Sequence, residues 1–415
     1  MERIFSALLP LLLLIALPAQ AAVPPFTYTT NDDGTLTVTA YNGSSVGVVI
    51  QSPTGGRTVT AIGDGAFDSD TFASITIPNT VTYIGSYAFF ACQSLTNANI
   101  PTNVVTIGDG AFEDCFSLVL SNVVFPASLT TIGANAFTWD SLSQVTIPGT
   151  VTNLGDAAFC ECMKLTNAII GNGIGSIGNY EFWDSTNLLS VTIPDSVTNI
   201  GQVAFSYCLN LSNIAIPASV TNIGIHAFDE CASLKAITVD PENPVFSSVG
   251  GVLFNKNQTA LITFPGGIAG SYTVPRGVTS IGDEAFMDCG ALSAIYFLAN
   301  APSLGSEVFE NDNMTAYYLP GTTGWGGFST NSGLATVLWN PLIQIANGNF
   351  GVRKNSFGFD VTGSANLPVV IEAATNLANP VWVSVQSLTL TNGLFYFSEP
   401  LQTNSTYRFY RISHS

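Results

Sequence analysis

Positive charges and histidines are scarce in this sequence. Its 415 residues include 10 Lys and Arg against 28 Asp and Glu, with only two His. The net charge of −18 repels phosphate backbones and anionic lipids, which argues against nucleic-acid binding and electrostatic attachment to membranes. Because His226 and His414 lie in what we expect to be different domains, a catalytic triad built on histidine is almost excluded.

Long apolar runs are absent beyond the N-terminus. There, Arg3 precedes an apolar stretch from Ile4 to Leu17, and residues 19–21 (Ala-Gln-Ala) offer a cleavage site. This arrangement is typical of an export signal. We therefore predict an exported protein, secreted or held at the cell surface. No later segment approaches the length needed to cross a bilayer, so we expect no transmembrane segment in the mature chain.

The sequence also lacks the glycine patterns of nucleotide-binding proteins. Ten of its 38 glycines stand at a repeated turn, and none of the 38 forms a phosphate-binding loop or a dinucleotide fingerprint. Carboxylate pairs such as 113–114 and 229–230 are interpreted as a solvated acidic ridge, with weak calcium binding by adjacent turns as the alternative. We expect no enzyme activity, no catalytic residue, no cofactor and no metal site.

What the sequence does contain is a repeat of about 23 residues. Ten Ile-Gly or Leu-Gly pairs recur in one register, each with a phenylalanine four residues after its glycine. These residues are Phe67, Phe89, Phe112, Phe137, Phe159, Phe182, Phe205, Phe228, Phe286 and Phe309. Such self-similarity predicts a solenoid, whose stacked units share a core that none could bury alone. We expect the ten rings to form one internal column.

The segment LLSVTIPDSVTNIGQVAFSYC (188–208) indicates what each unit forms. Residues 188–193 alternate between apolar and polar, which predicts a short strand with one covered face, and Pro194 ends it. Residues 197–200 alternate again and predict a second short extended piece. A glycine turn and one tight helical turn should follow.

The pattern L–I–IP–V–IG–AF–C, carried by residues 57–320, resembles the BspA-like leucine-rich repeat family of exported and surface proteins. The resemblance implies a right-handed solenoid with a parallel sheet on its concave side, and roles in adhesion or in binding extracellular proteins and surfaces. The predicted fold class is a leucine-rich-repeat solenoid, rich in β-structure, with a parallel strand ladder, short second strands and single helical turns. A small all-β sandwich-like domain should follow it.

Five regions are predicted along the chain. They are a signal peptide (1–21), an N-terminal β-hairpin cap (22–58), the BspA-like repeats (59–320, with an extended insertion unit at about 240–275), a C-terminal cap or linker (321–341) and the β-sandwich-like domain (342–415). A shift in charge supports the last boundary, because residues 22–341 hold 24 acidic and 5 basic residues whereas 342–415 hold 3 and 4. The C-terminal region loosely resembles terminal β-modules of other exported bacterial proteins, a resemblance that carries no activity.

The seven cysteines follow the repeat. Six stand three residues after a repeat phenylalanine, where other units carry Asp70, Asp140, Ser185 and Asp312. These six are Cys92, Cys115, Cys162, Cys208, Cys231 and Cys289. The shared register predicts buried free thiols, although disulfides Cys92–Cys115 and Cys208–Cys231 remain an alternative. Cys160 lies outside this register and is expected to be exposed.

The stretch HAFDEC (226–231) places a histidine, two carboxylates and a thiol close together. His226 occupies a register that other repeats fill with residues as different as Gly65, Tyr87 and Glu284, so we expect it to face solvent. Cys231 should point inward, so the two side chains should not converge on a metal. We interpret the stretch as architecture.

The outward positions of the predicted sheet are small, polar and uncharged. They include Ser74, Thr76, Asn97, Asn99, Gln144, Thr146, Ser190 and Thr192. Our leading hypothesis is an exported, non-enzymatic binding or adhesion protein that presents this strip, on an acidic scaffold, to an extracellular protein or glycan. The alternative is a surface-layer or spacer protein that acts by self-association.

Overall fold

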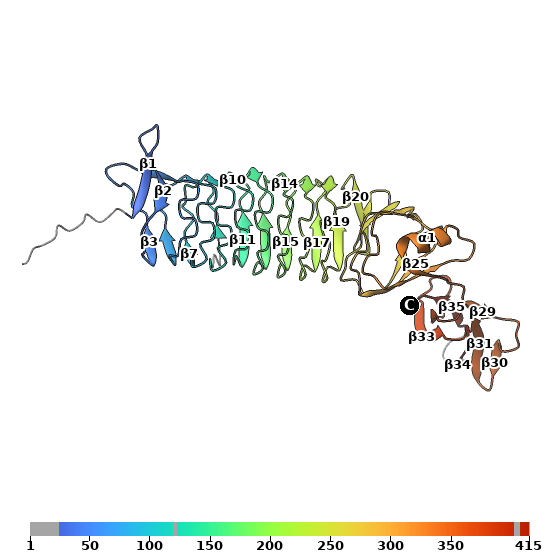
Figure 1. Cartoon of the computed structure of the whole chain (residues 1–415). Coiled ribbons are helices and arrows are strands. Elements are labelled where there is room, and N and C mark those ends of the chain that lie inside the picture. Colours follow the sequence, from blue (N-terminus) through green and yellow to red (C-terminus); the bar gives the residue numbers. More distant parts are fainter. Residues whose placement is uncertain (1–24, 119–122, 402–406, 415) are drawn as a thin grey trace, which may run out of the picture.

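The predicted solenoid is present in the computed structural model of the chain (Figure 1). The structure describes residues 25–118, 123–401 and 407–414, so the predicted signal peptide lies outside the described residues. Successive coils stack along one axis, from the blue hairpin at one end to the orange helix at the other (Figure 1). The C-terminal strands lie beyond that helix. The predicted fold class is confirmed.

The first strands of the coils form a parallel ladder that is divided into four hydrogen-bonded sheets along the solenoid. In Gln144–Ile147, Val145 and Ile147 are buried whereas Gln144 and Thr146 are exposed, as the alternating pattern predicts. Equivalent residues pair directly, since Gln144 lies opposite Asn167. The strands of this ladder are β3 (Gly47–Val49), β5 (Ser74–Thr76), β7 (Asn97–Ala98), β9 (Val123–Val124), β11 (Gln144–Ile147), β13 (Asn167–Ile170), β15 (Ser190–Thr192), β17 (Asn213–Ile216), β19 (Ala236–Val239), β23 (Gly270–Val274), β25 (Leu292–Phe297), β27 (Thr315–Tyr318) and β28 (Ala335–Leu338).

A second ladder of short strands ends at the Ile-Gly pairs. Gly155 shows why glycine is required there, because a Cβ at this position would lie 2.3 Å from the Ala134 backbone nitrogen of the preceding coil. The strands are β4 (Val59–Ile62), β6 (Tyr83–Ile84), β8 (Thr106–Ile107), β10 (Thr131–Ile132), β12 (Asn153–Leu154), β14 (Ser176–Ile177), β16 (Asn199–Ile200), β18 (Asn222–Ile223), β24 (Ser280–Ile281) and β26 (Ser303–Leu304).

The segment after each glycine forms two tight turns, which we call the turn column, in place of the single helical turn that the sequence predicted. In one coil Tyr87 and Ala91 adopt left-handed backbone conformations, with φ of 56° and 54°. The Phe89 backbone nitrogen between them donates to the Ala111 carbonyl of the next coil at 2.8 Å. Turns and inter-coil bonds thus alternate along this segment, and its polar backbone groups are paired between coils.

The repeat phenylalanines form two stacked series, so the prediction of one continuous column is wrong. Eight rings, from Phe67 to Phe228, stack with centroids 4.9–5.9 Å apart. A second series runs through Phe264, Phe286 and Phe309, at 4.8 and 5.1 Å. Phe264 was missed because no Ile-Gly pair precedes it. The insertion between the two series also divides the repeat core into two hydrophobic clusters.

The insertion is an antiparallel meander of three strands, β20 (Phe246–Val249), β21 (Val252–Asn255) and β22 (Ala260–Thr263). Strand β22 then pairs in parallel with β24, which returns the chain to the repeat. A turn at 256–257 joins β21 to β22, and a turn at 250–251 joins β20 to β21.

Each end of the repeat core is covered. The hairpin of β1 (Phe26–Thr30) and β2 (Leu36–Tyr41) places the rings of Phe26 and Tyr41 about 6 Å from that of Phe67. At the other end, α1 (Trp325–Ser332) places Trp325 against Phe297. No helix of the described residues is long and apolar enough to cross a membrane.

The C-terminal region consists of antiparallel strands in two sheets. One sheet contains β29 (Leu342–Gln344), β30 (Gly351–Arg353), β31 (Ser356–Thr362) and β34 (Leu394–Pro400), and the other β32 (Leu367–Ala374), β33 (Val383–Leu390) and β35 (Phe409–Ser413). This region shares a core with Tyr296 and Tyr317 of the solenoid. His414 stacks on Tyr296 at 4.4 Å, so the C-terminal strands dock on the outward face of the last coils.

Candidate functional site

The outward positions of the first ladder form a surface that we call the polar strip. Of the eight residues predicted for it, Ser74 is half-buried and the other seven are exposed. The strip continues across β13, β17 and β19, where Ile169, Ala215 and Thr238 are exposed in the same register. The repeat register alone would have found these three residues. The strip is therefore broader and less polar than the sequence-based interpretation held.

Two of the predicted strip residues are engaged within the solenoid. The Asn99 side chain accepts a hydrogen bond from the Ile77 backbone nitrogen and donates one to the Ile77 carbonyl, both at 2.8 Å. Its amide therefore extends the ladder beyond the end of β7. Ser190 Oγ donates to Asn167 Oδ1 at 2.7 Å. Asn99 thus has a structural role and is a poorer candidate for partner binding than Thr146 or Thr192.

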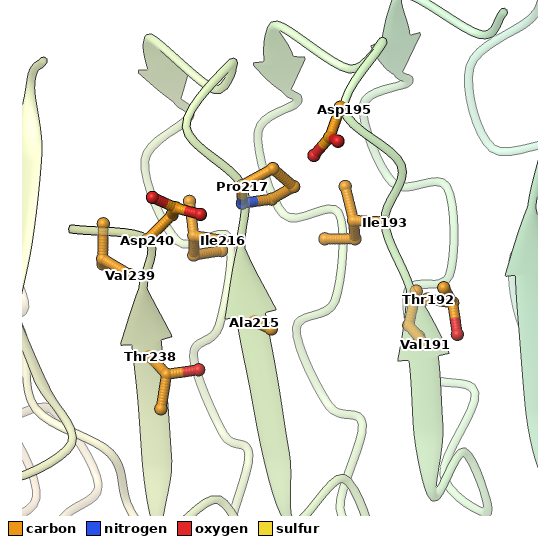
Figure 2. Close-up of a pocket in the computed structure, with 10 residues that line it drawn as sticks. All are labelled: Val191, Thr192, Ile193, Asp195, Ala215, Ile216, Pro217, Thr238, Val239 and Asp240. Atoms are coloured by element: carbon orange, nitrogen blue, oxygen red, sulfur yellow. The ribbon is translucent and has the colours of Figure 1, made fainter. Parts of the chain in front are cut away.

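A groove of about 420 Å³ crosses the ends of β15, β17 and β19 (Figure 2). Its floor is apolar and includes Ile216 and Pro217, and the exposed carboxylates of Asp195 and Asp240 lie at its two sides. Thr192 is the only residue predicted for the strip that lines the groove. The groove thus joins a short apolar surface to two negative charges.

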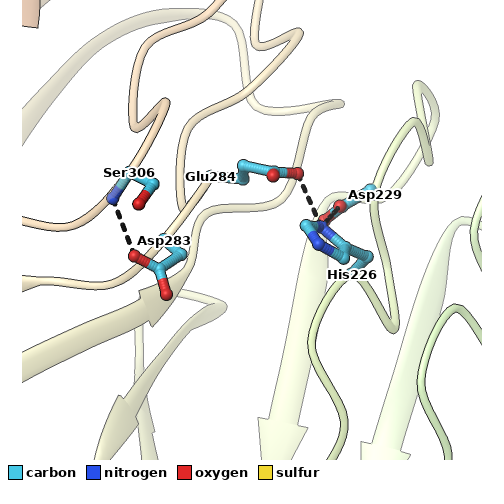
Figure 3. A network of polar contacts seen from close by, with 5 residues as sticks. All are labelled: His226, Asp229, Asp283, Glu284 and Ser306. Atoms are coloured by element: carbon cyan, nitrogen blue, oxygen red, sulfur yellow. Dashed lines mark hydrogen bonds and ion pairs between the residues drawn. The ribbon is translucent and has the colours of Figure 1, made fainter.

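The turn column brings His226 to Asp229 of the same turn and also to Glu284, a residue that the sequence-based interpretation did not bring into contact with it (Figure 3). Its Nδ1 lies 2.6 Å from Asp229 Oδ2 and 2.6 Å from Glu284 Oε2. The expectation that His226 faces solvent is wrong in part, because only 26% of its side chain is exposed. Glu284 occupies the same register as His226 and reaches it across the insertion.

Asp283, next to Glu284, has a different role. Its Oδ1 accepts a hydrogen bond from the Ser306 backbone nitrogen of the following coil at 2.7 Å (Figure 3). Asp109 and Asp156 make the equivalent contact to Ala134 and Asn179. Asp283 therefore belongs to the inter-coil bonding, whereas the Glu284 carboxylate is directed to His226.

The electrostatics of this cluster are those of partly buried carboxyl groups. Burial raises the pKa of Asp229 to about 6, although the hydrogen bond with His226 acts in the opposite direction. The side chains of Asp229 and Glu284 are 16% and 17% exposed. The three groups thus lie at the surface but are largely withdrawn from water.

The cysteine register is buried, as predicted, and all seven cysteines are free thiols. The thiols donate to the carbonyl of the phenylalanine one coil earlier, for example Cys115 Sγ to Phe89 O at 3.0 Å. Ser185 Oγ makes the same bond to Phe159 O. The prediction that Cys160 is exposed is wrong, because it is only 6% exposed and desolvation raises its pKa to about 12.

We expect the native thiols to resist modification. A thiol reagent such as dithionitrobenzoate attacks through the thiolate, and burial disfavours the charged form. At pH 8 the folded chain should react slowly, whereas all seven thiols should react in denaturant without reductant. Fast reaction of the folded chain, or fewer than seven thiols after unfolding, would contradict the buried free-thiol arrangement.

A second hollow, of about 400 Å³, lies in the C-terminal region. Aromatic residues line it, including Phe350, Trp382 and Tyr410, together with Arg408. Arg408 is fixed by Glu399, whose Oε2 accepts from its guanidinium at 2.9 Å. This charge is therefore already paired within the protein.

Comparison with known proteins is consistent with this geometry. Residues 60–189, 154–270 and 269–351 match the BspA type leucine rich repeat region, in six copies. A leucine rich cell surface protein from Faecalibacterium prausnitzii A2-165 is 29% identical, over 72% of this chain and 76% of that one, with a TM-score of 0.53. No curated protein matches the chain.

Two further solved structures are similar. A leucine rich repeat protein from T. pallidum is 29% identical over 45% of this chain and 88% of that one, with a TM-score of 0.43. A leucine-rich repeat protein from Bacteroides ovatus ATCC 8483 is 22% identical over 77% and 99%, with a TM-score of 0.46. Since the family match extends over well more than half of its residues, the chain belongs to the BspA-type leucine-rich-repeat family.

Proposed function

We propose that this protein is an exported, non-enzymatic binding or adhesion protein that holds an extracellular partner on its polar strip. The observation that carries the proposal is the groove across β15, β17 and β19, set within a strip of short exposed side chains. The similarity to a cell surface protein supports the proposed location. Docking of the C-terminal strands on Tyr296 and Tyr317 leaves the strip upstream of these coils as the surface for a partner.

A protein partner fits the groove better than a glycan does. Its lining residues are aliphatic, small or acidic, and they include no aromatic ring on which a sugar could stack. The carboxylates of Asp195 and Asp240 favour a basic side chain, as does the net charge of −18. We therefore propose an extended protein segment that carries Lys or Arg, bound through many weak contacts along the strip.

Neutralising the groove should weaken this binding. In the variant Asp195→Asn/Asp240→Asn, affinity for a partner recovered from extracellular proteins should fall at least about tenfold, since two favourable charge contacts are lost. Affinity would be measured by surface plasmon resonance with the mature chain immobilised. The salt dependence of binding should weaken as well, because rim charges act mainly through long-range attraction.

The matched control is Glu307→Gln/Glu310→Gln, which also removes two negative charges but in the exposed turn column. Its affinity should equal that of the wild type. Equal losses in both variants would mean that net charge, and not the groove, determines binding. Reproducible absence of any saturable partner among extracellular proteins and glycans would remove the proposed function.

A further inference from the structure

We propose that His226, Asp229 and Glu284 form a binding site for a first-row divalent transition metal ion such as Zn²⁺. The site lies in the turn column, at the junction where the insertion divides the repeat core (Figure 3). It is separate from the groove and does not depend on the proposed binding function. Its role would be to fasten the regular coils to those that follow the insertion.

The convergence of three donor atoms is the first argument. One atom, His226 Nδ1, lies 2.6 Å from an oxygen of each of two carboxylates. An imidazole nitrogen carries at most one hydrogen, so it cannot donate a full hydrogen bond to both oxygens. The three ligand atoms lie within 4.8 Å of one another, and a cation between them would satisfy all three.

The backbone holds two of these side chains in matching positions. His226 and Glu284 occupy the same step of their turns, and both adopt a left-handed conformation, with φ of 58° and 50°. Non-glycine residues adopt this conformation at a cost, but here it is repeated in coil after coil by the turn geometry. The two ligands are therefore held by the fold, with Asp229 three residues beyond His226 on the same turn.

There is room beside the cluster for a water ligand. A cavity of about 20 Å³ is lined by Asp229 and Glu284, together with Glu230 and Asp288. That volume is sufficient for about one water molecule. Three protein ligands with one water give the four-coordinate arrangement common for zinc. The additional carboxylates lower the electrostatic potential and so favour a cation.

The junction is a place where a cross-link would matter. In the regular coils the turn column is joined by backbone bonds, such as Tyr207 N to Asp229 O at 2.9 Å. Beyond the His226 turn this pattern changes. The Ala285 carbonyl accepts a hydrogen bond from the backbone nitrogen of Phe264, at the end of the insertion, at 2.8 Å. The His226 and Glu284 turns are thus joined at the surface by the side chains of the proposed site.

The ligand set indicates which metals to expect. An imidazole nitrogen with two carboxylates suits Zn²⁺ and its neighbours in the first row, whereas Ca²⁺ and Mg²⁺ prefer oxygen ligands alone. Cys231 takes no part, because its thiol points inward and donates to Phe205 O. The site therefore differs from the histidine–thiol pair that the sequence suggested and that we interpreted as architecture.

Calorimetric titration of zinc sulfate into the mature chain, freed of metal by a chelator and carrying no histidine tag, tests the site. We expect saturable binding of one Zn²⁺ per chain, and an increase in melting temperature when zinc is present. His226→Gln and Glu284→Gln should each weaken binding by at least about tenfold and remove the thermal effect. Excess Mg²⁺ or Ca²⁺ should not compete.

The matched control is Glu307→Gln, the next residue in the same register, which lacks a histidine neighbour. It should bind zinc as the wild type does. If the wild type shows no saturable binding, the three side chains form only a hydrogen-bonded cluster, and the proposal is overturned. An equal loss of zinc affinity in Glu307→Gln would overturn the proposal as well. So would unchanged zinc binding in a His226→Gln variant whose circular dichroism spectrum shows that it is folded.

Discussion

Replacing Phe137 by alanine should lower the free energy of unfolding by about 3–5 kcal/mol. The ring is fully buried, and it stacks between Phe112 at 5.4 Å and Phe159 at 5.5 Å. Its removal leaves a cavity that the neighbouring coils cannot fill, because the inter-coil backbone bonds on each side of the ring set their spacing. The loss would be measured by urea denaturation, followed by tryptophan fluorescence.

The position of Phe137 within the array adds to this effect. In a solenoid each unit contacts only its neighbours, so one weak coil reduces the coupling between the coils before and after it. The matched control is Phe116→Ala, since that ring is 43% exposed in the turn column. The free energy of unfolding of Phe116→Ala should differ from that of the wild type by no more than about 0.5 kcal/mol. Similar effects for the two variants would show that the stacked rings are not the main source of stability.

The repeat made most of this fold predictable. Residues that recur at one spacing must take equivalent positions in successive coils, so one repeat read correctly predicts the others. Register alone therefore placed Phe137 and Cys115 in the core and Thr146 on the outer face, as the structure has them. The domain boundaries, including the start of the C-terminal region near Pro341, remain predictions.

Two of the errors concern residues where the repeat is interrupted. Phe264 lies in a coil that lacks the Ile-Gly pair, so the pattern could not reveal that it stacks on Phe286. The contact between His226 and Glu284 joins residues 58 positions apart in sequence, across the insertion. Their shared register was a usable signal, but whether the insertion keeps them apart depends on its three-dimensional path.

The cysteine register shows a further limit. The sequence indicated small buried side chains at this position but did not explain why Cys, Ser and Asp share it. In the structure, Cys115 and Ser185 each donate a hydrogen to a phenylalanine carbonyl one coil earlier. A short side chain that can donate one hydrogen therefore fits this register. A neutral carboxyl group satisfies the same requirement, whereas a carboxylate does not.

Mild acid should therefore stabilise this protein, and its free energy of unfolding should be greater at pH 5 than at pH 8. Asp140 is fully buried in the cysteine register, and desolvation raises its pKa well above its usual range. Desolvation also raises the pKa of Asp312 to about 7 and that of Asp70 to about 6. Desolvation also raises the pKa of Glu181, which is buried elsewhere in the turn column.

The direction of this pH effect follows from the difference in pKa between the folded and unfolded states. A carboxyl group whose pKa is raised by folding does not lower the free energy of unfolding below its unfolded pKa of about 4, because it is protonated in both states there. As the pH rises towards the folded pKa, the unfolded chain ionises first and is favoured. Each pKa unit corresponds to about 1.4 kcal/mol. Because Asp70 and Asp312 are partly in contact with water, we discount their shifts and expect a total loss of about 2–4 kcal/mol from pH 5 to pH 8.

Asp140→Asn isolates one of these groups. Asp140 Oδ1 accepts from the Cys115 backbone nitrogen at 3.2 Å, and an asparagine oxygen can keep that bond without ionising. The variant should be more stable than the wild type at pH 8 and closer to it at pH 5. Asp195→Asn, which replaces a carboxylate at an exposed position, is the matched control. Urea denaturation at a series of pH values would measure both variants, and a wild-type stability that rises from pH 5 to pH 8 would contradict the neutral state assigned to the buried carboxyl groups.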